Sequence, residues 1–310
     1  MPNPPMRSML SLRHLRHLLA ALILIASVAI TIQSFDWRMV THSLRQLNVG
    51  VLFGGGLPVL ATIFALRGWR WLIVLGIPFN RARFWRSFCA NGTAAGLASL
   101  TPLQLGEIVK IRMIPDHHGS AWRLGVSGFF IERMLDLCGM LGLGLHGLMA
   151  HFGWHWMAPL ALALPLVGAA CLSLLSSQIA HLPQRVRHYA AALRHTRRVV
   201  LAAALTVFIW LLYAGLWWIA AMSMHVMLNF DRISLLLGSV MLAVVVSMTP
   251  GGLGVSELGS RGIMLWLGAS AAEAETTAIA IRLLTPLIAL AGLACLLPLL
   301  RRRRARIPIG

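Results

Sequence analysis

Nine ionisable residues lie within or beside long apolar stretches of this 310-residue chain. Acidic and basic side chains in such places can bind a charged ligand or take up a proton. The nine are Glu107, Lys110, Arg112, Glu132, Arg133, Asp136, Glu257, Arg261 and Arg282. Because an unpaired charge at a bilayer centre costs about 3 kcal/mol on the insertion scale, all nine would cost on the order of 25 kcal/mol. A fold worth about 5–15 kcal/mol cannot carry that cost. We therefore expect these charges to be paired, to lie near the interface or to line a wet cavity.

Glu132, Arg133 and Asp136 occupy neighbouring turns of one predicted helix. Glu132 and Asp136 share a face, and Arg133 can pair with Asp136, three residues away. One interpretation is an internal salt-bridge lock, and Arg112 and Arg261 could simply reach toward the interface. The other starts from the balance of four acids against five bases, which leaves the group at +1. An anionic headgroup fits that excess, since arginine presents a planar fork that suits phosphate oxygens.

The sequence offers little for catalysis. The four cysteines lie far apart in apolar runs, without a Cys-x-x-Cys pair, so no zinc site is expected. No nucleophile stands beside a base, and no Gly-Lys-Ser/Thr follows the glycine-rich run at Gly251. We expect a protein that is not an enzyme, with no cofactor and no metal.

The composition excludes a soluble protein. Hydrophobic residues make up 58% of the chain and charged residues 12%, which leaves too little polar surface to cover a water-soluble domain. A formal charge of +18 would indicate nucleic acid binding in a soluble chain. Here the basic residues gather in short clusters between uncharged stretches, as in polytopic membrane proteins, so no nucleic acid partner is expected.

The predicted fold is an all-α polytopic membrane protein, with residues 1–310 forming a single integral membrane domain. Six stretches reach the length of about 20 residues that a membrane-crossing helix needs. They are 18–35, 50–66, 124–150, 156–178, 199–224 and 276–300. Two more apolar stretches, 88–114 and 233–268, are interrupted and predict re-entrant broken-helix hairpins. The residues that would break them are Thr101, Pro102, Gly106, Thr249, Pro250, Gly251, Gly252 and Gly254.

The arginine positions predict the orientation of the chain in the membrane. Four segments on one predicted side hold 18 arginines: the tail before residue 18, the loops 67–87 and 181–198, and the tail 301–306. The opposite loops hold only Arg38, Arg45 and Arg232. Because basic loops stay in the cytoplasm, both termini are expected there, with 88–114 entering and leaving from the cytoplasm and 233–268 from outside.

The two interrupted stretches also resemble each other. Residues 99–107 (SLTPLQLGE) align with residues 247–257 (SMTPGGLGVSE) at an offset of 148. Arg133 aligns with Arg282 at an offset of 149. This predicts two repeat units, each made of a span, a broken hairpin and a span.

The units cover about 50–150 and 199–300, with a linking span at about 156–178. Because one extra crossing separates them, the second unit is inverted, which is an architecture typical of transporters. Half-helix N-termini at the two breaks could then face an anion.

Three motifs together resemble a known family, the transmembrane, flippase-type region of lysylphosphatidylglycerol synthases and their stand-alone relatives. They are Pro102-x-x-x-Gly106-Glu107 with a basic residue after it, Glu132-Arg133-x-x-Asp136, and Thr249-Pro250-Gly251-Gly252-Leu253-Gly254-x-x-Glu257. The resemblance covers about residues 15–300. It implies a bacterial inner-membrane protein that moves lipid between leaflets: aminoacylated phosphatidylglycerol in the fused synthases, and other lipid or polyprenyl-linked cargo in relatives.

Two features depart from the family pattern. The fused synthases carry a large soluble aminoacyl-transfer domain, whereas this chain ends ten residues after Leu300. Lipid aminoacylation is therefore not expected. Lys110 stands where the family usually has arginine, which keeps the charge but loses the bidentate fork.

Taken together, the residues and the resemblance lead us to expect a flippase for an anionic, aminoacylated or polyprenyl-linked membrane lipid. The five bases of the nine-residue group would hold the headgroup, and the four acids would orient those bases or take up a proton. Further candidate partners are a separately encoded lipid-modifying enzyme and a second copy of the chain. Two alternatives stay open: an intramembrane enzyme or accessory protein for lipid-linked glycosyl transfer, with Glu132 and Asp136 as acid and base, and a scaffold for a separate lipid synthase.

Overall fold

The computed structural model describes residues 33, 37–113, 121–178, 195–247 and 249–304. Every regular element in these residues is a helix, so the predicted all-α polytopic fold is confirmed. Five helical stretches in this part of the chain are long and apolar enough to cross a membrane: Val49–Leu75, Ala158–Leu175, Thr196–Ser223, Phe230–Ser247 and Ala271–Leu300. The predicted first span, 18–35, lies outside the described residues.

The described residues of the first half form α2 (Trp37–Arg45), α3 (Val49–Leu75), α4 (Arg81–Ala98), the 3-10 helix η1 (Pro102–Met113) and α5 (Ala121–His151). Helix α3 begins after Asn48, whose side-chain oxygen accepts a hydrogen bond from Val51 N at 3.0 Å. It ends at Gly76, where φ is 67°. Asn80 caps α4 in the same way as Asn48 caps α3. These caps limit the α3–α4 connection to a short turn.

The second half contains α6 (Ala158–Ala161), α7 (Leu164–Gln178), α9 (Thr196–Ser223), α10 (Phe230–Ser247), the 3-10 turn η4 (Pro250–Gly252), α11 (Val255–Trp266), α12 (Ala271–Arg282) and α13 (Leu284–Arg304). A capping box begins α12, because Ser270 and Glu273 each accept a hydrogen bond from the other's backbone N–H. Only Leu283 separates α12 from α13.

The assignment of residues 67–87 to a loop is wrong for all but residues 76–80, because α4 already begins at Arg81. Helix α3 does not end near residue 66 but runs to Leu75, so its 27 residues span about 40 Å. Arg67 and Arg70 are therefore helical residues, 7% and 0% exposed, and not arginines of a cytoplasmic loop. They can be buried because acidic side chains of η1 and α5 meet them.

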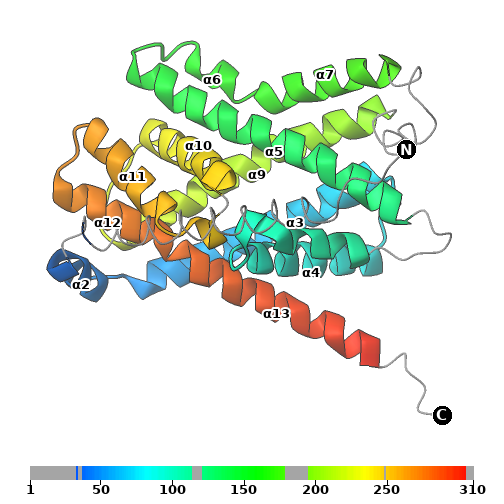
Figure 1. The fold of residues 1–310 in the computed structure, drawn as a ribbon, viewed down its shortest axis with the longest axis horizontal. Helices are drawn as coiled ribbons and strands as arrows, with labels where there is room; N and C mark the ends of the chain where they lie inside the picture. The colour runs from blue at the N-terminus through cyan, green and yellow to red at the C-terminus, as the bar shows by residue number, and fades with distance from the viewer. Residues whose placement is uncertain (1–32, 34–36, 114–120, 179–194, 248, 305–310) are drawn as a thin grey trace, which may run out of the picture.

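Most helices run roughly along the long axis of the molecule (Figure 1), so the arginine content of its two ends can be compared. One end carries the C-terminal ends of α7 and α13 and the start of α9. The other end carries α2 and the turn between α11 and α12. Arginines lie at the first end in α9 and α13, as Arg197, Arg198 and residues 301–304, whereas α2 holds Arg38 and Arg45 at the opposite end. The ends thus differ in arginine content as the sequence predicts.

Three helix pairs make the most extensive contacts between the two halves of the chain: α3 with α9, α4 with α13, and α5 with α10. Glycines allow two of these pairs to approach closely. Gly96 of α4 meets Gly292 of α13, and Gly238 of α10 meets Gly144 of α5. A Cβ atom at Gly96, Gly292 or Gly238 would overlap the partner's backbone. The breaks also meet, since η1 contacts η4.

Candidate functional site

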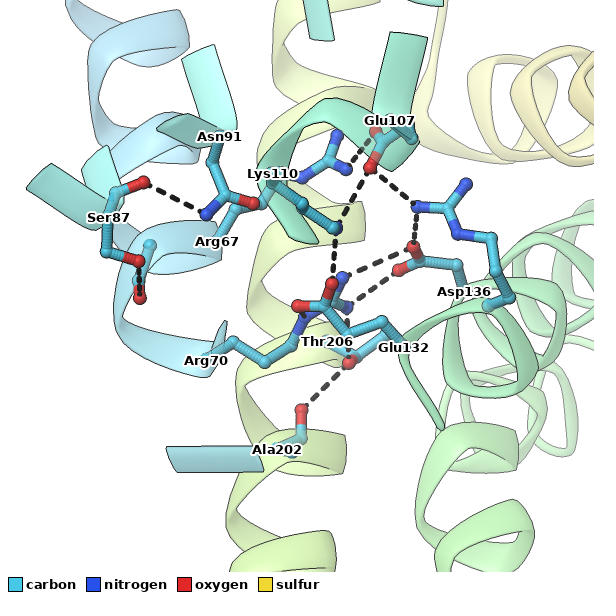
Figure 2. Close-up of polar contacts among 12 residues, drawn as sticks. Arg67, Arg70, Ser87, Asn91, Glu107, Lys110, Glu132, Asp136, Ala202 and Thr206 are labelled. Atoms are coloured by element: carbon cyan, nitrogen blue, oxygen red, sulfur yellow. Dashed lines mark hydrogen bonds and ion pairs between the residues drawn. The ribbon is translucent and has the colours of Figure 1, made fainter. Parts of the chain in front are cut away.

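Seven charged side chains from three helices form one network, which we call the buried charge cluster (Figure 2). Its members are Arg67 and Arg70 of α3, Glu107 and Lys110 of η1, and Glu132, Arg133 and Asp136 of α5. Four cations against three acids leave the cluster at +1. The burial of so many charges is possible because nearly every charged atom faces an opposite charge.

Arg70 is the central cation and is fully buried. Its Nε donates to Glu132 Oε1 at 3.1 Å, and its two terminal nitrogens donate to the two oxygens of Asp136 at 2.7 and 3.2 Å. Nη1 also donates to Thr206 Oγ1 of α9 at 2.8 Å. Figure 2 shows the guanidinium enclosed by these three partners. Arg70 therefore ties α3 to α5 and α9, and little of it is left to bind a ligand.

Lys110 is equally enclosed, with 1% of its surface exposed. Its Nζ donates to Glu107 Oε2 at 2.9 Å and to Glu132 Oε2 at 2.5 Å. The same atom lies 4.8 Å from the centre of the Trp71 ring, within cation–π range. Lys110 thus bridges η1 to α5, and a compact ammonium suits this two-acid site.

Arg67 links the cluster to α9. It forms an ion pair with Glu107, and its Nη1 donates to the Tyr213 hydroxyl at 3.1 Å. Both side chains of the ion pair are nearly buried. Arg67 therefore holds the carboxylate of Glu107 in place inside the molecule.

Arg133 differs from the other cations because 24% of its side chain is exposed. Its Nη2 lies 2.9 Å from Asp136 Oδ2 and 3.5 Å from Glu107 Oε2, and its guanidinium carbon is 5.5 Å from the centre of the Phe129 ring. These contacts hold one side of the guanidinium. The exposed remainder makes Arg133 the cation of the cluster that a ligand can best reach.

A central cavity of about 180 Å³ lies beside the cluster. Its charged wall is made by Arg67, Glu107, Arg133 and Asp136, and its polar atoms include those of Tyr213. The breaks between the helices contribute Ser99, Thr249, Gly251 and Ser256. The rest of the wall is mostly aliphatic and aromatic and comes largely from α9, α10 and α13. This arrangement can receive an anionic group at one wall and apolar groups at the other.

The second break is held in place by Arg282 of α12. Its Nη1 donates to the Gly251 carbonyl oxygen at 2.9 Å, and its Nε lies 3.1 Å from Glu257 Oε1. Gly251 has φ 55° and abuts the Ser99 carbonyl, so a side chain would neither fit there nor adopt that backbone easily. Ser256 Oγ donates to the other oxygen of Glu257 at 2.7 Å. Arg282 and Glu257 thereby position the cavity wall without lining it.

The nine predicted residues fall into three groups in the structure. Glu107, Lys110, Glu132, Arg133 and Asp136 meet in the buried charge cluster, and three of these, Glu107, Arg133 and Asp136, line the cavity. Glu257 and Arg282 pair with each other. Arg261 lies 3.4 Å from Glu275, and Arg112 is exposed at the end of η1, so these two lie apart from the cavity.

The predicted helix breakers lie at the two interruptions. Thr101 Oγ1 donates to Leu97 O at 2.9 Å and accepts from Gly106 N at 3.0 Å, which folds the chain back between α4 and η1. Pro102 and Pro250 begin η1 and η4. Gly252 and Gly254 follow with φ of 68° and 78°. Both turns place backbone against the central cavity.

Arg67 and Arg70 were not among the residues predicted for the site. Their signal is present in the sequence, because they are three residues apart and the apolar run continues after them from Trp71 to Leu75. A helix extended through this run places both arginines on one face, beside the acids of the next elements. Tyr213 and Thr206 carry no such signal, since each is an ordinary polar residue of a hydrophobic helix.

Comparison with known proteins completes this description. Residues 17–304 match the family model of the lysylphosphatidylglycerol synthase TM region, so the match includes the whole cluster and both breaks. Neither the curated proteins nor the solved structures contain a match to the chain. The chain belongs to the lysylphosphatidylglycerol synthase transmembrane region family.

Proposed function

We propose that this protein is a lipid flippase of the bacterial inner membrane that moves an anionic, aminoacylated or polyprenyl-linked lipid between leaflets. The observation that carries the proposal is the central cavity, in which four members of the buried charge cluster form one wall and an apolar surface forms the other. A lipid has this same division between headgroup and chains. Membership of a family defined on a lipid synthase's membrane region supports a lipid ligand.

Arg133 is the residue we assign to the headgroup. The cluster has one cation in excess, and Arg133 is its most exposed cation, with 24% of its side chain exposed. An anionic group in the cavity would neutralise that excess, and a partly desolvated guanidinium binds phosphate oxygens strongly. Arg67, which also lines the cavity, is the second cation within reach of the same group.

The packing of the helices supports two inverted units that enclose the cavity. The Glu107–Arg133 pair in the first half has its counterpart in the Glu257–Arg282 pair in the second. The first hairpin helix of each half packs on the last long helix of the other half, α4 on α13 and α10 on α5. Inverted units that meet near the midplane allow a site to be exposed to either side.

The orientation we propose places the arginine-rich end of the molecule, with both termini, in the cytoplasm. In this orientation α4 with η1 enters and leaves from the cytoplasmic side, and α10 with α11 enters and leaves from the outside. The rule that basic segments remain in the cytoplasm supports it.

The geometry favours translocation over the catalytic alternative. Glu132 and Asp136, the two acids considered as acid and base, are both engaged by cations. Glu132 contacts Arg70 and Lys110, while Asp136 contacts Arg70 and Arg133. A general base needs a free lone pair directed at its substrate, and these carboxylates direct theirs at neighbouring side chains.

The proposal is tested by reconstituting the purified protein in vesicles that contain headgroup-labelled fluorescent phosphatidylglycerol. A membrane-impermeant reductant bleaches the outer leaflet, and translocation appears as further loss of fluorescence. We expect translocation with wild type and with Arg123→Ala, which removes an exposed arginine of the same helix. Arg133→Ala should abolish it. Equal translocation by all three proteins, or by none of them with any anionic or polyprenyl-linked probe, would overturn the proposal.

A further inference from the structure

A second cavity, the side pocket, lies between α5 and α10 and measures about 170 Å³. Phe129, Leu137 and Met140 line it from α5, and Val244 and Val245 line it from α10. We propose that this side pocket holds the acyl chain of the bound lipid, and that the lipid exchanges with the bilayer here. The inference rests on the proposed function and adds the position of the lipid's acyl chain.

The side pocket adjoins the central cavity. Arg133, Asp136, Met140, Val244 and Thr249 line both. A molecule with its charged group against Arg133 therefore has a second space directly beside that group. The walls of this space are mainly apolar, which fits a hydrocarbon chain and not a second polar group.

The packing of α5 on α10 explains why the space exists. At one end of the pair, Gly238 packs against the backbone at Gly144 so closely that no Cβ fits, and Gly147 packs against Asp231 and Leu235. Farther along the pair, the larger side chains of Leu137 and Met140 from α5 and of Val244 and Val245 from α10 line the side pocket. The pocket thus lies beside the region of close glycine contact.

The side pocket reaches the lateral surface of the molecule. Val245 is 36% exposed although it lines the pocket, and the next residue, Val246, is 77% exposed. Phe129 also lines the pocket, and its ring contacts Arg133. In a membrane this surface faces lipid, so a chain can pass from the side pocket to the bilayer while the headgroup stays at Arg133.

The test uses the full-length protein in nanodiscs of phosphatidylcholine that contain phosphatidylglycerol with a photoactivatable diazirine on one acyl chain. After illumination, peptide mass spectrometry locates the adducts. We expect adducts on α5 and α10 at residues of the side pocket, and we expect excess unlabelled phosphatidylglycerol to suppress them. Val245→Trp, which fills the pocket, should lower this labelling about tenfold, the change that corresponds to 1.4 kcal/mol. Val246→Trp adds the same bulk one residue away, outside the lining, and should leave the labelling unchanged.

The outcomes separate this inference from the proposed function. If phosphatidylglycerol is retained by wild type and lost in Arg133→Ala, but adducts fall outside the side pocket or Val245→Trp labels like wild type, the acyl-chain site is overturned and the headgroup site stands. A side pocket left unlabelled because another stretch of this chain or a second copy fills it would overturn the inference in the same way. If wild type and Arg133→Ala retain the lipid equally, both proposals fail.

Discussion

The cations of the buried charge cluster divide into two kinds by their surroundings. Arg70 and Lys110 are fully enclosed and use their donors on acids of the cluster. Arg133 keeps 24% of its side chain exposed and lines both cavities. Because a buried ion pair is costly to break from one side, Arg70 and Lys110 should hold the fold, while Arg133 is more accessible to a ligand.

This division predicts different effects on stability. Arg70→Ala would leave Asp136 without its bidentate partner and Glu132 with Lys110 alone, and breaking a buried pair in this way costs roughly 3–5 kcal/mol. Arg133→Ala removes a partly exposed cation and leaves Glu107 with Arg67 and Lys110 and Asp136 with Arg70, so it should cost less. Thermal unfolding in detergent, followed by tryptophan fluorescence, measures both. A melting temperature lowered more by Arg133→Ala than by Arg70→Ala would contradict this division.

The chemistry of individual residues was only partly predictable from the sequence. The spacing of Arg133 and Asp136 predicts a pairing that the structure places at 2.9 Å. Arg67 and Arg70 escaped prediction because arginine at the end of an apolar run usually marks a cytoplasmic loop. Their acidic partners come from η1 and α5. Only the packed fold therefore distinguishes a buried arginine from one that marks a cytoplasmic loop.

At the scale of the elements, the crossings of α4 with α13 and of α5 with α10 determine where the cavities lie. Both crossings depend on a glycine in each helix. Gly144 and Gly292 are separated by the same offset of 148 as the two interrupted motifs, whereas their partners Gly238 and Gly96 are not. The sequence predicts close helix approach at such glycines but not which helix is the partner.

A larger side chain at one crossing should separate the helices. Gly238→Leu would overlap the backbone of α5 at Met140 and Gly144, and overpacking costs about 1–3 kcal/mol or more. Gly262→Leu is the matched control, because no atom lies within 4 Å of a Cβ at that helical glycine. We expect a lower melting temperature and less monodisperse protein for Gly238→Leu alone. Equal behaviour of the two variants would show that the α5–α10 contact is not as close as described.

At the scale of the whole molecule, the sequence predicts the all-α membrane fold and the family, because composition, arginine placement and the three motifs are all readable without contacts. It predicts α5 and α9 to within three residues, at 121–151 and 196–223. The cavity could not be predicted, since its wall combines residues of α3, η1, α5, α9 and α10. Arginine asymmetry between the two ends of the molecule is the global feature that sequence and structure share.

The central claim is that the cavity binds an anionic lipid headgroup through Arg133. Mass spectrometry of the lipids retained by gently purified protein tests it most directly, with wild type beside Arg133→Ala and Arg123→Ala. We predict that one anionic or polyprenyl-linked lipid class is enriched with wild type and Arg123→Ala and is lost with Arg133→Ala. The same bulk membrane lipids on all three proteins would contradict the claim and would leave the buried charge cluster a purely structural feature.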